Sequence, residues 1–313
     1  MTSLIFMGTP DFSVPILRML AEDGYDIRAV VTQPDRPVGR KKILTPTPVK
    51  DEALRLGLKV IQPEKLKGSS ELQDIISLQA DIIITAAFGQ LLPIELLESP
   101  KYGCLNVHAS LLPAYRGGAP IHQAIIDGQS ETGVTIMYMA EKLDAGDIIS
   151  QQAIAIKPTD TTGILFEKLS IVGRDLLKQT LPIILRNEHT RQSQDEKHVT
   201  FARNISREQE RIDWSKSASS IYNQVRGLHP WPIAYTTLLG QTVKIWWGEK
   251  GTGNKDQKVG SVVGILEDRI IIQTGDNETF EILELQPSGK KKMTAGEFLR
   301  GTGSKLQIGD RFL

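Results

Sequence analysis

The chain has 313 residues, of which 40% are hydrophobic and 24% charged, and 37 basic side chains balance 37 acidic ones. The length favours two domains of ordinary globular composition, and the balanced charge excludes attraction of a polyanion by a general field, so such a partner needs a local basic patch. The single cysteine, Cys104, excludes an intramolecular disulfide. Because we find neither a secretory pattern nor an apolar run as long as a membrane span, we expect a soluble protein of the reducing cytoplasm.

Residues 1 to about 150 alternate between short apolar runs and amphipathic runs. We predict strands at SLIFM, DIRAVVT, LKVIQ and DIIITAA, separated by helices at SVPILRMLAEDG, VKDEALRLG and ELQDIISLQA. This alternation predicts parallel crossovers and therefore an open α/β sheet covered by helices on both sides. Ligands of such sheets bind outside the carboxyl ends of the strands.

The motif MGTPDF follows the first predicted strand and invites a dinucleotide-binding interpretation. Gly8 is present, but Pro10 and Phe12 stand where the fingerprint needs a second glycine and an open approach for pyrophosphate. We therefore favour a structural tight turn. The chain also lacks a phosphate loop, a serine-hydrolase elbow around Ser110 and metal-ligand spacing among its five histidines, so we expect no metal. Cys104 lies in an apolar run, which favours a buried side chain over a nucleophile.

The stretch NVHASLLPAYRGGAP places Asn106 and His108 two positions apart at the end of a predicted strand. Residues i and i+2 of a strand share a face, so the carboxamide and the imidazole point the same way. Asp144, in EKLDAGDII, is the acid we favour beside them, with Asp147 as the alternative. Such a trio suits acyl transfer to an amine, because a carboxamide stabilises an oxyanion and an imidazole oriented by a carboxylate handles the proton. The competing interpretation is turn capping with a hydrogen-bonded structural histidine.

The second half of the chain begins with a long predicted helix in TDTTGILFEKLSIVGRDLLKQTLPIILRN, capped at Asp160 and Thr161. The polar stretch EHTRQSQDEKH lacks periodicity, so we predict a first domain over residues 1–190, a linker over 191–205 and a second domain over 206–313. After a helix at SASSIYNQVRGL, short runs with turn residues predict a small antiparallel barrel or sandwich. We expect its KIWW run to lie in the core rather than on a stacking surface.

Two blocks, NVHASLLPAYRGGAPIHQAIIDG and TGVTIMYMAEKLDAGDII, closely resemble the signature of the folate-dependent formyltransferases. The resemblance implies a Rossmann-like formyltransferase domain followed by a C-terminal OB-like β-barrel that contributes tRNA contacts. It also implies that Asn106, His108 and Asp144 are catalytic and that a formyl group passes from 10-formyltetrahydrofolate to the amino group of initiator methionyl-tRNA. No membrane and no obligatory protein partner is implied.

The same resemblance assigns two binding segments. Tetrahydrofolate binding falls on SLLP, comprising Ser110, Leu111, Leu112 and Pro113, and tRNA binding falls on the loop RPVGRKK through Arg36, Arg40, Lys41 and Lys42. Family members acting on glycinamide ribonucleotide are the main alternative, but they usually end after the first domain. A domain that has lost catalysis and only binds RNA is a further alternative, against which the intact trio argues.

Overall fold

The computed structural model describes residues 1–39, 41–253 and 257–313, and the chain divides into two units. The first unit comprises Met1–Pro120, Glu131–Ala155 and Phe166–Arg203, and the second comprises Ile121–Ser130, Ile156–Leu165 and Asn204–Leu313. Each unit is therefore assembled from separate stretches of the chain. The continuous domain limits expected from the sequence stay a prediction.

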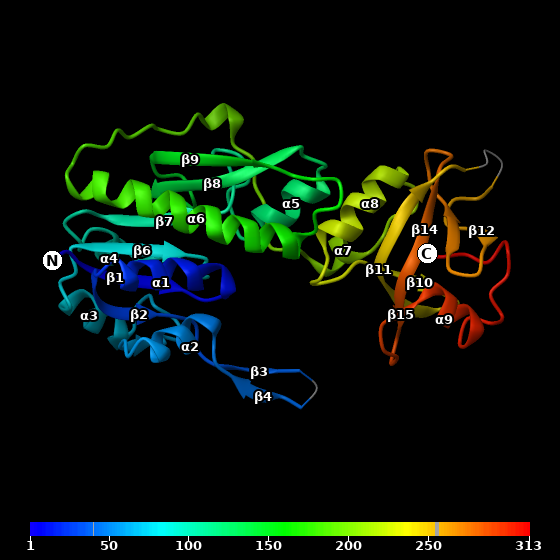
Figure 1. The fold of residues 1–313 in the computed structure, drawn as a ribbon, viewed down its shortest axis with the longest axis horizontal. Helices are drawn as coiled ribbons and strands as arrows, with labels where there is room; N and C mark the ends of the chain where they lie inside the picture. The colour runs from blue at the N-terminus through cyan, green and yellow to red at the C-terminus, as the bar shows by residue number, and fades with distance from the viewer. Residues whose placement is uncertain (40, 254–256) are drawn as a thin grey trace. The chain divides into compact units, whose positions relative to one another are not determined.

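A seven-stranded sheet forms the centre of the first unit (Figure 1). Its spatial order is β5 (Val60–Ile61), β2 (Asp26–Val31), β1 (Ser3–Gly8), β6 (Ile82–Ala86), β7 (Cys104–His108), β8 (Glu131–Tyr138) and β9 (Ile148–Ala155). The strands from β5 to β7 pair in parallel, whereas β8 runs antiparallel to both of its neighbours, β7 and β9. The predicted Rossmann-like α/β sheet is thus confirmed, with β8 and β9 added at one edge by antiparallel pairing.

Helices connect these strands, as the alternating sequence predicts. They are η1 (Asp11–Ser13), α1 (Val14–Glu22), α2 (Pro48–Arg55), α3 (Ser70–Ser77), α4 (Ile94–Leu97) and α5 (Pro120–Ile126). The helices α6 (Thr162–Leu185) and η2 (Glu196–His198) follow the last strand, and most of α5 and the start of α6 belong to the second unit. The Thr47 hydroxyl accepts from the backbone of Lys50 at the start of α2, and the Ser69 hydroxyl accepts from that of Leu72 at the start of α3. Every residue of β1 and β6 is buried, as expected of strands covered on both faces.

The basic stretch expected to be a loop forms a small hairpin instead. Strands β3 (Arg36–Val38) and β4 (Ile43–Thr45) pair antiparallel, with Val38 opposite Ile43. Figure 1 shows this hairpin extending away from the sheet of its own unit. The β-branched residues on both sides of the turn favour extended backbone, a local signal that the proline and glycine of this stretch obscured.

The second unit is built on an antiparallel sheet in the order β10 (Tyr235–Leu238), β11 (Gln241–Gly251), β14 (Thr279–Pro287), β13 (Ile270–Gln273) and β12 (Val262–Ile265), with β15 (Met293–Thr294) beside β14. Its helices are α7 (Arg207–Glu210), α8 (Ala218–Gly227) and α9 (Ala295–Arg300). Isolated bridges join Phe312 to Leu238 in β10 and Arg311 to Ser261 just before β12. One short segment thus pairs near both ends of the sheet, which is curled into a half-barrel. The predicted barrel-like class of the second domain is therefore confirmed.

The expectation for the KIWW run is right for Ile245 and wrong for the two tryptophans. Ile245 belongs to the buried core of the second unit, whereas Trp246 and Trp247 are only half-buried. The pairing of β11 with β14 shifts register on both sides of Trp247. A bulge of this kind disrupts the alternation of faces, so both rings lie outside the core and contact His229 instead.

Among the residues described, no helix has the combination of length and apolarity needed to cross a bilayer.

Candidate active site

Strand β7 presents its two polar side chains on the sheet face opposite α6. A Cβ atom at Gly173 of α6 would lie 2.8 Å from Val107 Cγ1, so Val107 packs directly under that helix. Asn106 and His108 flank Val107 and therefore project from the other face. The predicted sharing of one face is met, but the two side chains lie over the sheet near the strand end rather than beyond its tip.

Thr85 of the neighbouring strand β6 fixes the carboxamide of Asn106. The Thr85 hydroxyl lies 2.9 Å from Asn106 Oδ1 and at the same distance from the Leu105 carbonyl oxygen. The single hydrogen of this hydroxyl is shared between the two oxygens, and the Nδ2 group of Asn106 is the donor left for a bound oxygen atom. Asn106 is only half-buried, so a substrate can reach that donor.

His108 lies between a backbone carbonyl and the carboxylate of Asp144. Its Nε2 atom is 3.0 Å from the carbonyl oxygen of Tyr115, and its Nδ1 atom is 3.8 Å from Asp144 Oδ2. A carbonyl only accepts hydrogen bonds, so Nε2 carries a hydrogen and the neutral ring leaves Nδ1 able to take a proton. The proton would then arrive beside a carboxylate, which stabilises the resulting cation.

The turn carrying Asp144 is held in an uncommon conformation. Asp144 has a positive φ of 48°, and its Oδ2 atom accepts a hydrogen bond of 2.8 Å from the backbone of Gly117. Gly117 itself has a φ of 123° and lies against the Ala202 carbonyl, where a Cβ would come within 2.5 Å. The alternative acid, Asp147, accepts from the Ser193 hydroxyl at 3.1 Å instead. Of the two acids, the structure brings Asp144 to His108.

The SLLP segment folds over the same sheet face beside the trio. The Leu112 amide donates to Thr135 Oγ1 at 3.1 Å, and the Gln151 side chain donates to the Leu112 carbonyl at 2.8 Å. The Leu112 side chain is buried with Met137 and Ile148, whereas Leu111 and Pro113 stay partly exposed. Ser110 is fully buried and donates to the Ala114 carbonyl, so its hydroxyl serves the loop.

The residues predicted to bind tRNA differ in their surroundings. Arg36 forms a bidentate pair with Glu64, with nitrogen–oxygen distances of 2.6 and 3.2 Å. Lys41 and Lys42 are exposed at the hairpin tip and, within the part of the chain that the structure describes, have no carboxylate partner. Arg40 lies outside the described residues.

Other candidate chemistry is not supported by the geometry. Burial raises the pKa of the Cys104 thiol to about 12, so the reactive thiolate is disfavoured. No group of three or more histidine, cysteine or acidic side chains suited to a metal ion occurs among the residues that the structure describes.

Two family models match the chain in succession: "Formyl transferase" over residues 1–181 and "Formyl transferase, C-terminal domain" over residues 204–303. The chain belongs to the formyl transferase family. It is 68% identical over 312 residues to methionyl-tRNA formyltransferase of Lysinibacillus sphaericus, with full coverage of both chains. It is 57% identical over 311 residues to the enzyme of the same name from Bacillus thuringiensis, covering 99% of this chain and 98% of that one.

Two solved structures share the fold at low identity. An N-formyltransferase from Helicobacter canadensis, in complex with folinic acid and dTDP-3-aminofucose, matches with a TM-score of 0.69 at 20% identity and covers 92% of this chain and 100% of its own. HypX from Aquifex aeolicus, in complex with tetrahydrofolic acid, matches with a TM-score of 0.65 at 17% identity and covers 96% of this chain and 48% of its own.

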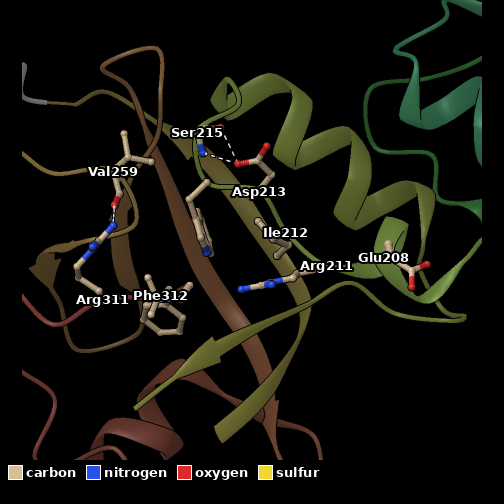
Figure 2. A pocket seen from close by; sticks show the side chains of 10 residues that line it. Glu208, Arg211, Ile212, Asp213, Ser215, Val259, Arg311 and Phe312 are labelled. Carbon is tan, nitrogen blue, oxygen red and sulfur yellow. Dashed lines mark hydrogen bonds between the residues drawn. The ribbon is translucent and has the colours of Figure 1, made fainter. Parts of the chain in front are cut away.

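The C-terminal unit contains a pocket of about 590 Å³ whose lining includes Trp214 and Phe312 (Figure 2). Arg311 donates to the Val259 carbonyl at 3.1 Å, and Asp213 accepts from the Ser215 hydroxyl at 2.6 Å. Because these polar groups are bonded within the unit, we assign the pocket no part in the reaction.

Three side chains that support the site were not predicted from the sequence: Thr85, Arg116 and Gln194. Thr85 sits in an apolar strand, and a polar residue at a fully buried position was a usable signal. Arg116 is only 4% exposed and bonds to the Gln194 side chain. Gln194 lies in the stretch interpreted as a linker, where nothing in the local pattern indicated a contact.

Proposed function

We propose that this chain catalyses the transfer of a formyl group from 10-formyltetrahydrofolate to the amino group of initiator methionyl-tRNA, giving formylmethionyl-tRNA for translation initiation in the cytoplasm. The observation that carries the proposal is the distance of 3.8 Å between His108 and Asp144, with Asn106 two positions before His108 on the same strand. The chain that holds this trio is 68% identical to a methionyl-tRNA formyltransferase over its whole length. Attack of the amine on the formyl carbon places negative charge on oxygen and positive charge on nitrogen. The site has groups suited to both charges.

Asn106 is suited to the developing oxyanion. Its Nδ2 group remains a donor because Thr85 holds Oδ1. One such preorganised donor is typically worth about 3 to 4 kcal/mol of barrier height. Thr85 contributes by keeping the carboxamide from rotating and presenting its oxygen to the oxyanion.

His108 and Asp144 are suited to the amine proton. With Nε2 bonded to the Tyr115 carbonyl, the Nδ1 atom of His108 receives the proton, and the Asp144 carboxylate stabilises the imidazolium. The carboxylate stays oriented because the Gly117 amide donates to it. This scheme needs no covalent intermediate on the protein.

The folate co-substrate is assigned to the SLLP segment. Leu111 and Pro113 present partly exposed apolar surface beside the trio, which fits a flat aromatic ring system, while Leu112 anchors the segment in the unit. Folate derivatives occupy the Helicobacter canadensis and Aquifex aeolicus structures, whose fold this chain shares.

The tRNA is assigned to the hairpin of β3 and β4 together with further contacts from the second domain. Lys41 and Lys42 are exposed cations at the tip and suit phosphate oxygens. Arg36 is already paired with Glu64, so its contribution to tRNA would require exchange of that partner.

The experiment is a formylation assay with three acceptors: initiator methionyl-tRNA, elongator methionyl-tRNA and glycinamide ribonucleotide. With 10-formyltetrahydrofolate as donor, we expect the initiator tRNA to gain one formyl group and the ribonucleotide to gain none. Transfer to glycinamide ribonucleotide alone would assign the chain to that branch, and tRNA binding without any mass gain would show a binding module.

A further inference from the structure

The polar segment of residues 192–202 runs along both loops that build the active site. Gln192 exchanges backbone hydrogen bonds of 2.8 and 2.9 Å with Ile148, which follows the Asp144 turn. Further along, the Arg116 amide donates to the Thr200 carbonyl at 2.9 Å, and the Ala202 amide donates to the Arg116 carbonyl at 2.7 Å. The segment is therefore attached by backbone bonds near the Asp144 turn and to the loop that follows His108.

Gln194 connects these two attachments through its side chain. Its Nε2 group donates to the carbonyl oxygens of Asp144 and Gly146, each at 2.8 Å. Its Oε1 atom accepts from Arg116 Nε at 3.0 Å, and Arg116 is itself buried and paired with Glu196 at 3.0 Å. These three bonds of Gln194 use its amide in one orientation, so the nitrogen must face the Asp144 turn.

We propose that Gln194 is a positioning residue that holds the Asp144 turn so that the carboxylate faces His108. Asp144 has a φ of 48°, in the left-handed region that residues other than glycine adopt uncommonly, although aspartate tolerates it better than most. One carbonyl bound by Gln194 is that of Asp144 itself and the other is that of Gly146, two residues on, so losing the donor frees this backbone to relax and moves the carboxylate. The kinetic consequence rests on the proposed function; the structural consequence does not.

The sharpest variant is Gln194→Glu, which keeps the shape and the acceptor for Arg116 but replaces the donor by an oxygen that repels both carbonyls. Gln194→Met removes all three bonds of the side chain, including the acceptor for Arg116, without adding charge. Gln192→Glu is the matched control, because it introduces the same charge two residues away at an exposed side chain whose backbone pairing is kept.

We expect both Gln194 variants to lower kcat for formyl transfer about a hundredfold, the cost of displacing a reacting group by roughly an ångström, with the KM for 10-formyltetrahydrofolate unchanged and the thermal midpoint lowered by only a few degrees. Deuterium exchange of the Gly117 amide, which donates to Asp144, should accelerate in both. Gln192→Glu should match the parent in every measurement.

Parent kcat in the Gln194 variants, or parent exchange at Gly117, would overturn the proposal. So would a loss of kcat in Gln192→Glu equal to that in Gln194→Glu, since this would show an effect of charge alone. If the parent protein transfers no formyl group, the proposed function fails, and faster exchange at Gly117 in the Gln194 variants would still support the positioning role.

Discussion

Glu52 is a buried carboxylate that joins two helices of the first unit. Arg55, on the same helix α2, bonds it at 2.6 and 3.0 Å, and Arg18 of α1 bonds it at 2.8 and 3.1 Å. The Arg55 and Arg18 bonds together hold the pKa of Glu52 at about 2, well below its ordinary value of 4.5. Folding therefore favours the ionised form of Glu52, and the stability of the folded protein at neutral pH depends in part on this charge.

We predict that Glu52→Gln lowers the free energy of unfolding by about 2 to 3 kcal/mol at pH 7. The effect lies towards the lower figure if water screens the two arginines, whose side chains are partly exposed. A depressed pKa stabilises the fold above pH 4.5, and this contribution is lost as the pH falls from there towards 2. Urea unfolding of parent and variant at pH 7 and pH 3 measures it. A difference between the proteins that stays the same at both pH values would contradict the assignment.

At the level of single residues, part of the candidate site could be predicted from the sequence. The i, i+2 spacing of Asn106 and His108 was enough to place both on one face of a strand. Spacing could not decide between Asp144 and Asp147, because both lie in one short turn. The decision depends on Gly117 and Ser193, which are distant along the chain and bind one carboxylate each.

The β3–β4 hairpin is the element that we expect to meet tRNA. We predict that the double variant Lys41→Ala/Lys42→Ala weakens the productive tRNA complex and flattens its dependence on salt by about one slope unit for each phosphate that is no longer neutralised. Folate binding should stay at the parent value. The measurement is formylation of methionyl-tRNA across a salt series.

The matched control for the hairpin is Lys59→Ala/Lys101→Ala. Both lysines are exposed. Lys59 precedes β5 and Lys101 precedes β7, so both lie where these parallel strands begin, at the end of the sheet opposite the candidate site. The control removes the same charge, so it should keep the parent salt slope. If both double variants flatten the salt slope equally, the hairpin acts only through net charge; if both keep the parent slope, the hairpin lysines contact no phosphate. Either result would mean that specific tRNA recognition lies elsewhere.

Helices and strands could be predicted where a hydrophobic period or a capping residue marks them in the sequence. They could be predicted less well where contacts between distant residues determine the structure. The strands and helices of the first unit followed from alternation, whereas the 192–202 segment has no period because single bonds such as those of Gln194 hold it. The bulge at Trp247 was equally invisible, since only the pairing with β14 reveals it.

For the whole molecule, each unit has its own buried core, and the second depends on a residue close to the C-terminal end of the sequence. Phe312 is 1% exposed, and its ring lies 6.1 Å from that of Trp214. We predict that Phe312→Ala costs about 3 to 5 kcal/mol in the second unit. Its neighbour Leu313 is 52% exposed, so Leu313→Ala should change stability by no more than about 0.5 kcal/mol.

Intrinsic fluorescence follows this unit selectively, because all four tryptophans of the chain lie within it. The urea midpoint of the tryptophan signal should fall in Phe312→Ala and stay at the parent value in Leu313→Ala. Equal midpoints for the two variants would show that the bridging segment does not close the sheet.

We assign formyl transfer to methionyl-tRNA to Asn106, His108 and Asp144, and single-turnover formylation at saturating donor and tRNA measures what each residue contributes to the chemical step. We predict that His108→Ala and Asp144→Asn each slow the chemical step by about a hundredfold to ten-thousandfold, while Asp147→Asn keeps the parent rate. A chemical step at the parent rate in both His108→Ala and Asp144→Asn, or a loss confined to Asp147→Asn, would contradict this assignment.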